Sequence, residues 1–254
     1  MHPYNFRKGS GPHPVLTIAI FFINIFLAFG IFTPYLPAAN ETSANIFFPL
    51  RKGSYWIYQG QTKWTSPETS QVLGKNITWK MQVEDVRQRG RLVVAKVKGY
   101  PQDLAWYEEG KMPGDYLIVQ ADEKYYLIEG EERVREVLSR LADQNDALVN
   151  LVQESELFLE KPLEKFQSFG ETAQLTREDG FYHWVVDDEN QTELDQLQGS
   201  PLLAGTHTQY HLTLRTLPEH IFVDFVPGVG ITHYTYSHHG TVAEADLSLV
   251  EYSE

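Results

Sequence analysis

Alternation of apolar and polar residues is the feature that most restricts the fold of this chain. Residues 77–84 run Ile-Thr-Trp-Lys-Met-Gln-Val-Glu, so every second side chain is apolar. A period of two residues indicates a β-strand that buries one face. Aromatic and β-branched residues, which favour strands, recur in short segments on both sides of one helical stretch. The sequence therefore predicts strands at residues 55–58, 77–86, 91–98, 103–108, 116–120, 124–129, 181–187, 207–216, 220–226, 231–238 and 246–252.

Glycine marks three of the expected connections between strands. Gln88-Arg89-Gly90 is a short connection that predicts a hairpin. Val226-Pro227-Gly228-Val229 suits a type II turn, because proline fixes φ at the second position and glycine allows the positive φ of the third. His239-Gly240 predicts a tight hairpin between the last two strands.

The pattern changes from strand to helix after Glu131. Val134, Val137, Leu138 and Leu141 follow at steps of three and four residues, which is the spacing of one helix face. We expect an amphipathic helix in an insert at about residues 131–160, with a possible break at 143–145 and an end before Pro162. Its apolar stripe fits packing on the sheet, and the alternative is a helix that binds a partner.

A weak internal repeat divides the strands into two halves. Pro49-Leu50 precedes Trp56 as Pro162-Leu163 precedes Phe169, with the aromatic residue seven positions after the proline in both copies. We therefore predict an α+β fold, predominantly antiparallel β, with two similar β-rich halves at about residues 47–130 and 160–254. The halves are expected to form a curved sheet or half-barrel within a single domain, residues 40–254.

The N-terminal 39 residues have the pattern of an export signal or a membrane anchor. Residues 15–32 are uncharged, follow Arg7 and Lys8, and precede a segment with Pro34 and Pro37. The positive-inside rule keeps the N-terminus in the cytoplasm and exports the rest of the chain. The run is long enough to span a membrane if it is retained, and its exit also resembles a signal-peptide cleavage region. Both outcomes predict an extracytoplasmic domain, either membrane-anchored or secreted.

Composition excludes several classes of function. The chain has 34 Asp and Glu against 21 Lys and Arg, a net charge of −13, and no cysteine. Acidic chains lack the clustered cations that neutralise nucleic-acid phosphates, so we expect no nucleic-acid partner. The absence of cysteine excludes disulfides, thiol nucleophiles and thiolate metal sites. No HExxH, GxSxG or dinucleotide-binding pattern is present, and we expect no cofactor.

Histidine is concentrated in the C-terminal part, where seven of the nine follow residue 180. Imidazole binds zinc, copper and nickel, and three converging rings suffice for a site. Strand alternation places His207 and His211 on one face, and likewise His233 and His239. These four are the candidate metal ligands. The alternatives are histidines satisfied within the fold or at its surface, and a pH-sensitive role.

Aromatic residues suggest a binding surface. Tryptophans and tyrosines lie mostly in the expected strands, and a concave aromatic face crossed by the helix could hold an apolar ligand, by analogy with half-barrel carriers. Filling of the core is the alternative role for these rings. The candidate ligand-binding residues are Trp79, Trp106, Trp184, Tyr234, Tyr236 and His238.

Five segments resemble a family of proteins. They are the opening at residues 48–56 (FPLRKGSYW), the second Pro162-Leu163 entry, and the C-terminal PGVG, YTYSHHGT and LVEY segments. They resemble secreted or envelope-anchored bacterial proteins of unknown function. The resemblance implies export and a β-rich fold, and it carries no catalytic residues. The second opening departs from it, with Phe166 where the first has Gly53.

Two classes of function remain. The first is a non-catalytic extracytoplasmic domain that binds a hydrophobic ligand, a glycan or another envelope protein. The second is an enzyme, a metal-assisted hydrolase that uses the C-terminal histidines.

Overall fold

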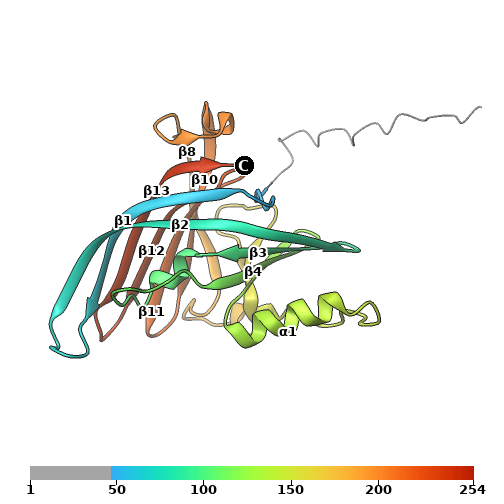
Figure 1. The fold of residues 1–254 in the computed structure, drawn as a ribbon, viewed down its shortest axis with the longest axis horizontal. Helices are drawn as coiled ribbons and strands as arrows, with labels where there is room; N and C mark the ends of the chain where they lie inside the picture. The colour runs from blue at the N-terminus through green and yellow to red at the C-terminus, as the bar shows by residue number, and fades with distance from the viewer. Residues whose placement is uncertain (1–46) are drawn as a thin grey trace, which may run out of the picture. The chain divides into compact units, whose positions relative to one another are not determined.

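The computed structural model describes residues 47–254, which form one curved, mostly antiparallel sheet of thirteen strands, nearly closed on itself (Figure 1). Its order is β6-β5-β4-β3-β2-β1-β13-β12-β11-β10-β8-β7, and β9 pairs in parallel with β13. Two short helices are present, so the predicted fold class is confirmed. The elements are β1 (Tyr55–Thr65), β2 (Val72–Arg89), β3 (Leu92–Lys98), η2 (Pro101–Leu104), β4 (Asp115–Ala121), β5 (Lys124–Ile128), α1 (Glu131–Ala142), η3 (Glu154–Glu156), β6 (Leu157–Glu160), β7 (Ser168–Phe169), α2 (Thr172–Leu175), β8 (Trp184–Glu193), β9 (Gln198–Gly199), η4 (Pro201–Leu203), β10 (Thr206–Arg215), β11 (Glu219–Val226), β12 (Gly230–His238) and β13 (Ala243–Ser253).

The first and last strands join the two halves of the sheet. β1 pairs antiparallel with β2 on one side and with β13 on the other. Strands that follow each other in the sequence pair from β1 to β6, and, apart from β9, again from β7 to β13. β6 and β7 are the two ends of this hydrogen-bonded order. The sheet is therefore open between β6 and β7.

The predicted turns are present. Gly228 has φ 85°, and the amide of Val229 donates to the carbonyl of Val226 at 3.0 Å, as a type II turn requires. Gly90 lies between β2 and β3 with φ 61°, and Gly240 lies between β12 and β13 with φ 97°. Local sequence thus sets these three reversals of the chain.

The main hydrophobic core fills the inside of the curved sheet and draws residues from both halves. Trp56, the aromatic residue of the first repeat, is fully buried there. Its ring stacks on Tyr252 with centroids 5.4 Å apart, and its Nε1 donates to the carbonyl of Val229 at 2.6 Å. Phe169 of the second repeat is also buried in this core. Each repeat residue therefore anchors the first strand of its half.

Helix α1 packs on the sheet, but on the outer face (Figure 1). Side chains alternate along β4, so Ile118 points into the main core while Leu117 points to the helix. The expectation that the helix crosses the concave face is therefore wrong, because β3 and β4 are apolar on both faces. The second cluster consists of Val94, Leu117, Val119, Ile128, Val134, Val137, Leu141 and Leu151.

The insert is helical only in its first part. α1 ends at Ala142, next to the break expected at residues 143–145. Residues 143–153 form a loop, and β6 then pairs with β5, so the end of the expected insert belongs to the sheet.

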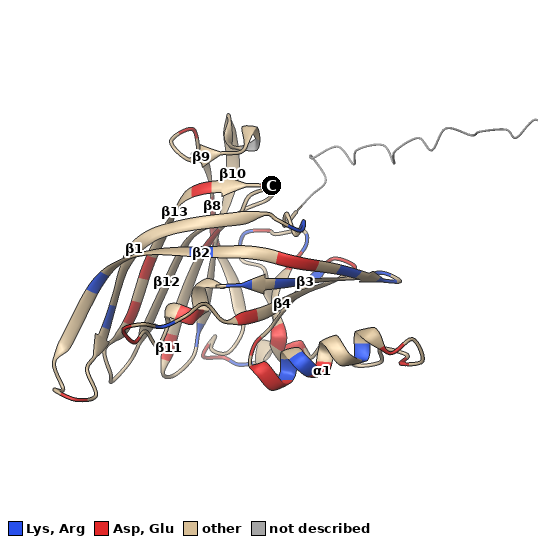
Figure 2. Cartoon of the chain, viewed as in Figure 1, with Lys and Arg blue, Asp and Glu red and all other residues tan. Residues whose placement is uncertain are grey.

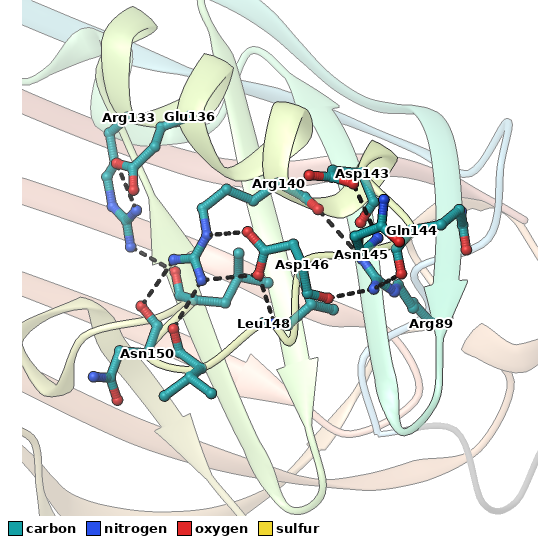
Figure 3. Close-up of polar contacts among 12 residues, drawn as sticks. Arg89, Arg133, Glu136, Arg140, Asp143, Gln144, Asn145, Asp146, Leu148 and Asn150 are labelled. Carbon is teal, nitrogen blue, oxygen red and sulfur yellow. Dashed lines mark hydrogen bonds and ion pairs between the residues drawn. The ribbon is translucent and has the colours of Figure 1, made fainter.

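Two arginines hold the loop after α1 (Figure 3). Arg89, at the end of β2, donates to the backbone carbonyls of Arg140, Asp143, Gln144 and Asp146. Arg140 forms an ion pair with the Asp146 carboxylate, with Nε 2.9 Å from Oδ2. The Arg89 contacts supply donors for carbonyls at and just beyond the helix C-terminus, which have no partner within the helix.

Residues 103–108 do not form the predicted strand. Pro101 begins the 3-10 turn η2, and a loop follows it. The buried carboxylate of Asp103 accepts hydrogen bonds from the Gly114 amide at 2.8 Å and from the Tyr116 hydroxyl at 2.9 Å. Proline has no amide hydrogen for a ladder, and these bonds fix the segment as a loop instead. Trp106 consequently lies on a loop.

Ion pairs link β2, β3 and β4 across the outer face of the sheet. Figure 2 shows acidic residues on β2 and β4 and basic residues on β3 between them. The Lys96 ammonium lies 2.9 Å from carboxylate oxygens of both Glu84 and Asp115. These hydrogen bonds raise the pKa of Lys96. The pairs are partly exposed and contribute little to stability.

Within residues 47–254, no helix combines the length and the apolar character needed to cross a membrane. The apolar run at residues 15–32, and with it the expected signal peptide or anchor at residues 1–39, lies outside the described residues.

Candidate functional site

The open edge of the sheet carries two adjoining cavities. The inner one has a volume of about 160 Å³ and the outer one about 250 Å³. Ser155, Leu157, Trp184 and Leu214 line both, so the two cavities meet at these residues. Trp184 is the first residue of β8, next to edge strand β7, and is only partly buried. This strand order is what brings an indole ring to the opening.

Aromatic rings form much of the inner cavity wall. Tyr100 from the turn before η2, Phe158 from β6 and Tyr234 from β12 join Trp184 there. The rings of Tyr100 and Phe158 meet edge to face, with centroids 6.3 Å apart. Burial raises the pKa of Tyr100 and of Tyr234, so both phenols are neutral at physiological pH. The Tyr234 hydroxyl donates to the side-chain oxygen of Gln102.

Three carboxylates also line the inner cavity. Glu156 pairs with Arg133, whose Nε lies 2.7 Å from Oε1. Glu219 accepts a hydrogen bond from the Tyr236 hydroxyl at 3.1 Å. Glu129 lies at the mouth, where desolvation by the surrounding protein, and then the negative charge of Glu219, raise its pKa. The cavity therefore combines an aromatic wall with negative charge.

The structure separates the six predicted ligand-binding residues. Trp184 and Tyr234 line the inner cavity. Tyr236 does not line the cavity itself, but its hydroxyl donates a hydrogen bond to Glu219, which does. Trp79 is buried in the core, where its indole donates to the carbonyl of Gly99 at 2.9 Å, and it lines neither cavity.

Trp106 and His238 lie together and line neither cavity. Their ring centroids are 4.7 Å apart, and the Trp106 side chain is 48% exposed. The Nδ1 atom of His238 is buried and has no hydrogen-bond partner among residues 47–254.

Two of the predicted metal ligands take part in a row of side chains across the outer face of β10 to β13. His211 Nδ1 lies 2.6 Å from Asp224 Oδ1, and His233 Nε2 lies 2.8 Å from Asp246 Oδ1. His233 Nδ1 lies 3.7 Å from the other oxygen of Asp224. The Asp224 contact, opposed by burial and reinforced by Asp246, raises the pKa of His233 to about 8.

The other two predicted ligands lie apart from this row. His239 faces His220, with their Nε2 atoms 3.4 Å apart. Burial lowers the pKa of His220, and His239 and Arg215 lower it further. The Nε2 atom of His207 is buried without a hydrogen-bond partner in the described part of the chain. Over residues 47–254, no group of three or more His, Asp or Glu side chains is placed to hold a metal ion.

Sequence reasoning missed several residues of the cavities, notably Tyr100, Gln102, Glu129 and Glu219. Gln102 lies in the turn that Pro101 begins, and this proline could have indicated a turn in place of the expected strand. Glu129 and Glu219 lie at strand ends in different halves, and only closure of the sheet brings them to one cavity. No local pattern could have paired them.

Comparison with known proteins yields likeness of structure only. No protein family model matches the chain, and no curated protein matches its sequence. A solved structure of a protein from Parabacteroides distasonis, inferred to be a lipoprotein, is 12% identical, with a TM-score of 0.33 over 82% of this chain and 98% of that one. Another, from Bacteroides fragilis, is inferred to be exported and has a YmcC-like fold. It is 9% identical, with a TM-score of 0.39 over 82% of this chain and 99% of that one.

Proposed function

We propose that this chain is an extracytoplasmic, non-catalytic binding protein whose two adjoining cavities hold a small ligand with an apolar body. The location is supported by the uncharged run at residues 15–32 behind Arg7 and Lys8. If that run is retained it anchors the domain to the membrane, and if it is cleaved the domain is secreted.

One observation carries the binding proposal: Trp184 stands where two cavities meet at the open edge of the sheet. Together the cavities reach the lower part of the volume range of ligand sites, about 300–1,000 Å³. Their common wall is completed by the apolar side chains of Leu157 and Leu214. Such sites hold an apolar body against aromatic and aliphatic walls and orient it with a few polar groups.

Titration with the uncharged fluorophore N-phenyl-1-naphthylamine tests this proposal. We expect a saturable rise in fluorescence with one site per chain. Ser155 is exposed and lines both cavities, so Ser155→Trp should block the site and weaken binding about tenfold or more.

Ser139→Trp is the matched control, because Ser139 is also exposed, lies on α1 and lines neither cavity. It should bind the fluorophore as the unchanged protein does. Absence of saturable binding, or equal affinity in the Ser155→Trp protein, would overturn the proposal.

A further inference from the structure

We propose that the ligand of the two cavities carries a positively charged nitrogen, an ammonium or amidinium group, attached to its apolar body. This inference rests on the proposed function and adds the charge of the ligand to it.

The first argument is the charge of the walls. The two cavities are lined by five glutamates, Glu129, Glu154, Glu156, Glu171 and Glu219, and by no lysine or arginine. Glu156 has Arg133 as its partner, and Glu154 accepts from the backbone amide of Thr172 at 2.9 Å. No cation within residues 47–254 pairs with any of the other three. These unpaired carboxylates would repel an anionic ligand, and no cation in the cavity walls would offset that repulsion.

The second argument is the placement of Glu129 and Glu219 in one small cavity. Desolvation raises the pKa of Glu129, and the negative charge of Glu219 raises it further, so the two carboxylates repel each other. A ligand cation between them would relieve this repulsion and lower the pKa of Glu129 again. Binding is thereby linked to the charge of both groups.

The third argument is the aromatic wall. Trp184, Tyr100 and Tyr234 line the same cavity as the two carboxylates. A cation over the face of an aromatic ring is attracted by the negative charge of that face, most strongly when the cation is desolvated. Rings and carboxylates thus favour the same chemical group, whereas a neutral apolar ligand needs only the rings.

The fourth argument is an unpaired histidine. His183 lines the outer cavity, is 7% exposed, and its Nδ1 has no hydrogen-bond partner in the described residues. A buried imidazole nitrogen without a partner costs free energy, and a neutral one can accept an N–H donor. A ligand rich in N–H groups supplies such a donor.

A matched series of octyl compounds tests the inference by competition with N-phenyl-1-naphthylamine at pH 7.5 and low salt. n-Octylammonium, n-octanol and octanoate share the apolar body and differ in charge. We expect octylammonium to bind about tenfold or more tightly than octanol, and octanoate to bind most weakly. Equal affinities for octylammonium and octanol would overturn the inference, whereas failure of the fluorophore to bind would overturn the proposed function itself.

The double variant Glu129→Gln, Glu219→Gln isolates the two carboxylates. Glutamine keeps an oxygen that accepts from Tyr236, so the fold should persist. Octylammonium affinity should fall to that of octanol, and octanol affinity should not change. Glu178→Gln is the control, since Glu178 is exposed and lines neither cavity. A double variant that binds octylammonium like the unchanged protein would refute the inference.

Discussion

Replacement of Arg89 by alanine should loosen the loop that follows α1. The guanidinium reaches four backbone carbonyls across this loop, with distances of 2.7 Å to Asp143 and 3.0 Å to Gln144 among them (Figure 3). Those carbonyls lie at and beyond the end of the helix, where the helix offers them no donors. Arg89 thus ties the outer helix to the tip of the β2–β3 hairpin.

The expected loss of stability follows from which bonds are shielded from water. The bonds to the carbonyls of Arg140 and Asp146 are partly buried, and losing each should cost about 1 kcal/mol. The bonds to Asp143 and Gln144 are exposed, so water replaces them at little cost. A cation at a helix C-terminus adds about 0.3–1 kcal/mol. We expect a total of about 2–3 kcal/mol.

Two measurements check this prediction. In thermal unfolding, a loss of that size corresponds to a melting temperature lower by roughly 4–12 °C for a domain of this length. Hydrogen exchange should become faster at residues 143–150, while the interior strands keep their relative protection. Arg89→Lys should show an intermediate loss, because one ammonium cannot reach all four carbonyls.

Arg91→Ala provides the control on the same hairpin. Arg91 is 87% exposed and makes a 3.4 Å ion pair with Asp122, which is worth less than about 0.5 kcal/mol. If Arg89→Ala melts within about 1 °C of the unchanged protein, or no lower than Arg91→Ala, the guanidinium contacts do not hold the loop and the reasoning is wrong.

Three further predictions concern the core, a turn and pH. Trp56→Ala and Phe169→Ala should each cost about 3–5 kcal/mol in urea unfolding, since both rings are buried, and an unchanged midpoint in either would contradict their matching roles in the two halves. Gly228→Val should cost about 1–3 kcal/mol, because φ 85° strains a β-branched residue, and an unaltered melting temperature would refute the importance of the turn. His233 has its pKa raised to about 8, above its unfolded value, so its stabilising charge is complete below about pH 6.5 and is lost as pH rises through 8. His233→Gln should remove about 1 kcal/mol of this pH dependence, a value reduced for the 37% exposure of the side chain, and a pH–stability curve identical to that of the unchanged protein would contradict it.

Much of the architecture could be predicted from local sequence. Alternation with a period of two identified most strands, including β2, and glycine identified the reversals at Gly90, Gly228 and Gly240. These features depend on residues close together in the chain, so neighbours alone specify them. The prediction of a strand at residues 103–108 was wrong. Asp103 accepts hydrogen bonds from Gly114 and Tyr116, which lie too far along the chain for the local pattern of the segment to indicate them.

The side of the sheet that α1 covers could not be predicted. The helix has one apolar stripe, but β4 carries apolar residues on both faces, with Leu117 turned to the helix and Ile118 to the core. The hydrophobic pattern alone therefore allows the helix to pack on either face of the sheet. The short connection from β5 to α1, together with the interior already filled from the second half, decides for the outer face.

The sequence by itself determined the strands, the turns, the amphipathic helix and the acidic, cysteine-free character of the chain. Only the tertiary structure decided where a ligand could bind. Glu129 and Trp184 belong to different halves, yet they line one cavity because β1 pairs with β13 and the sheet curls until its two ends, β6 and β7, lie close together. Hydrophobic periodicity records which face of a strand is buried, and it does not record which distant strand will lie opposite that face.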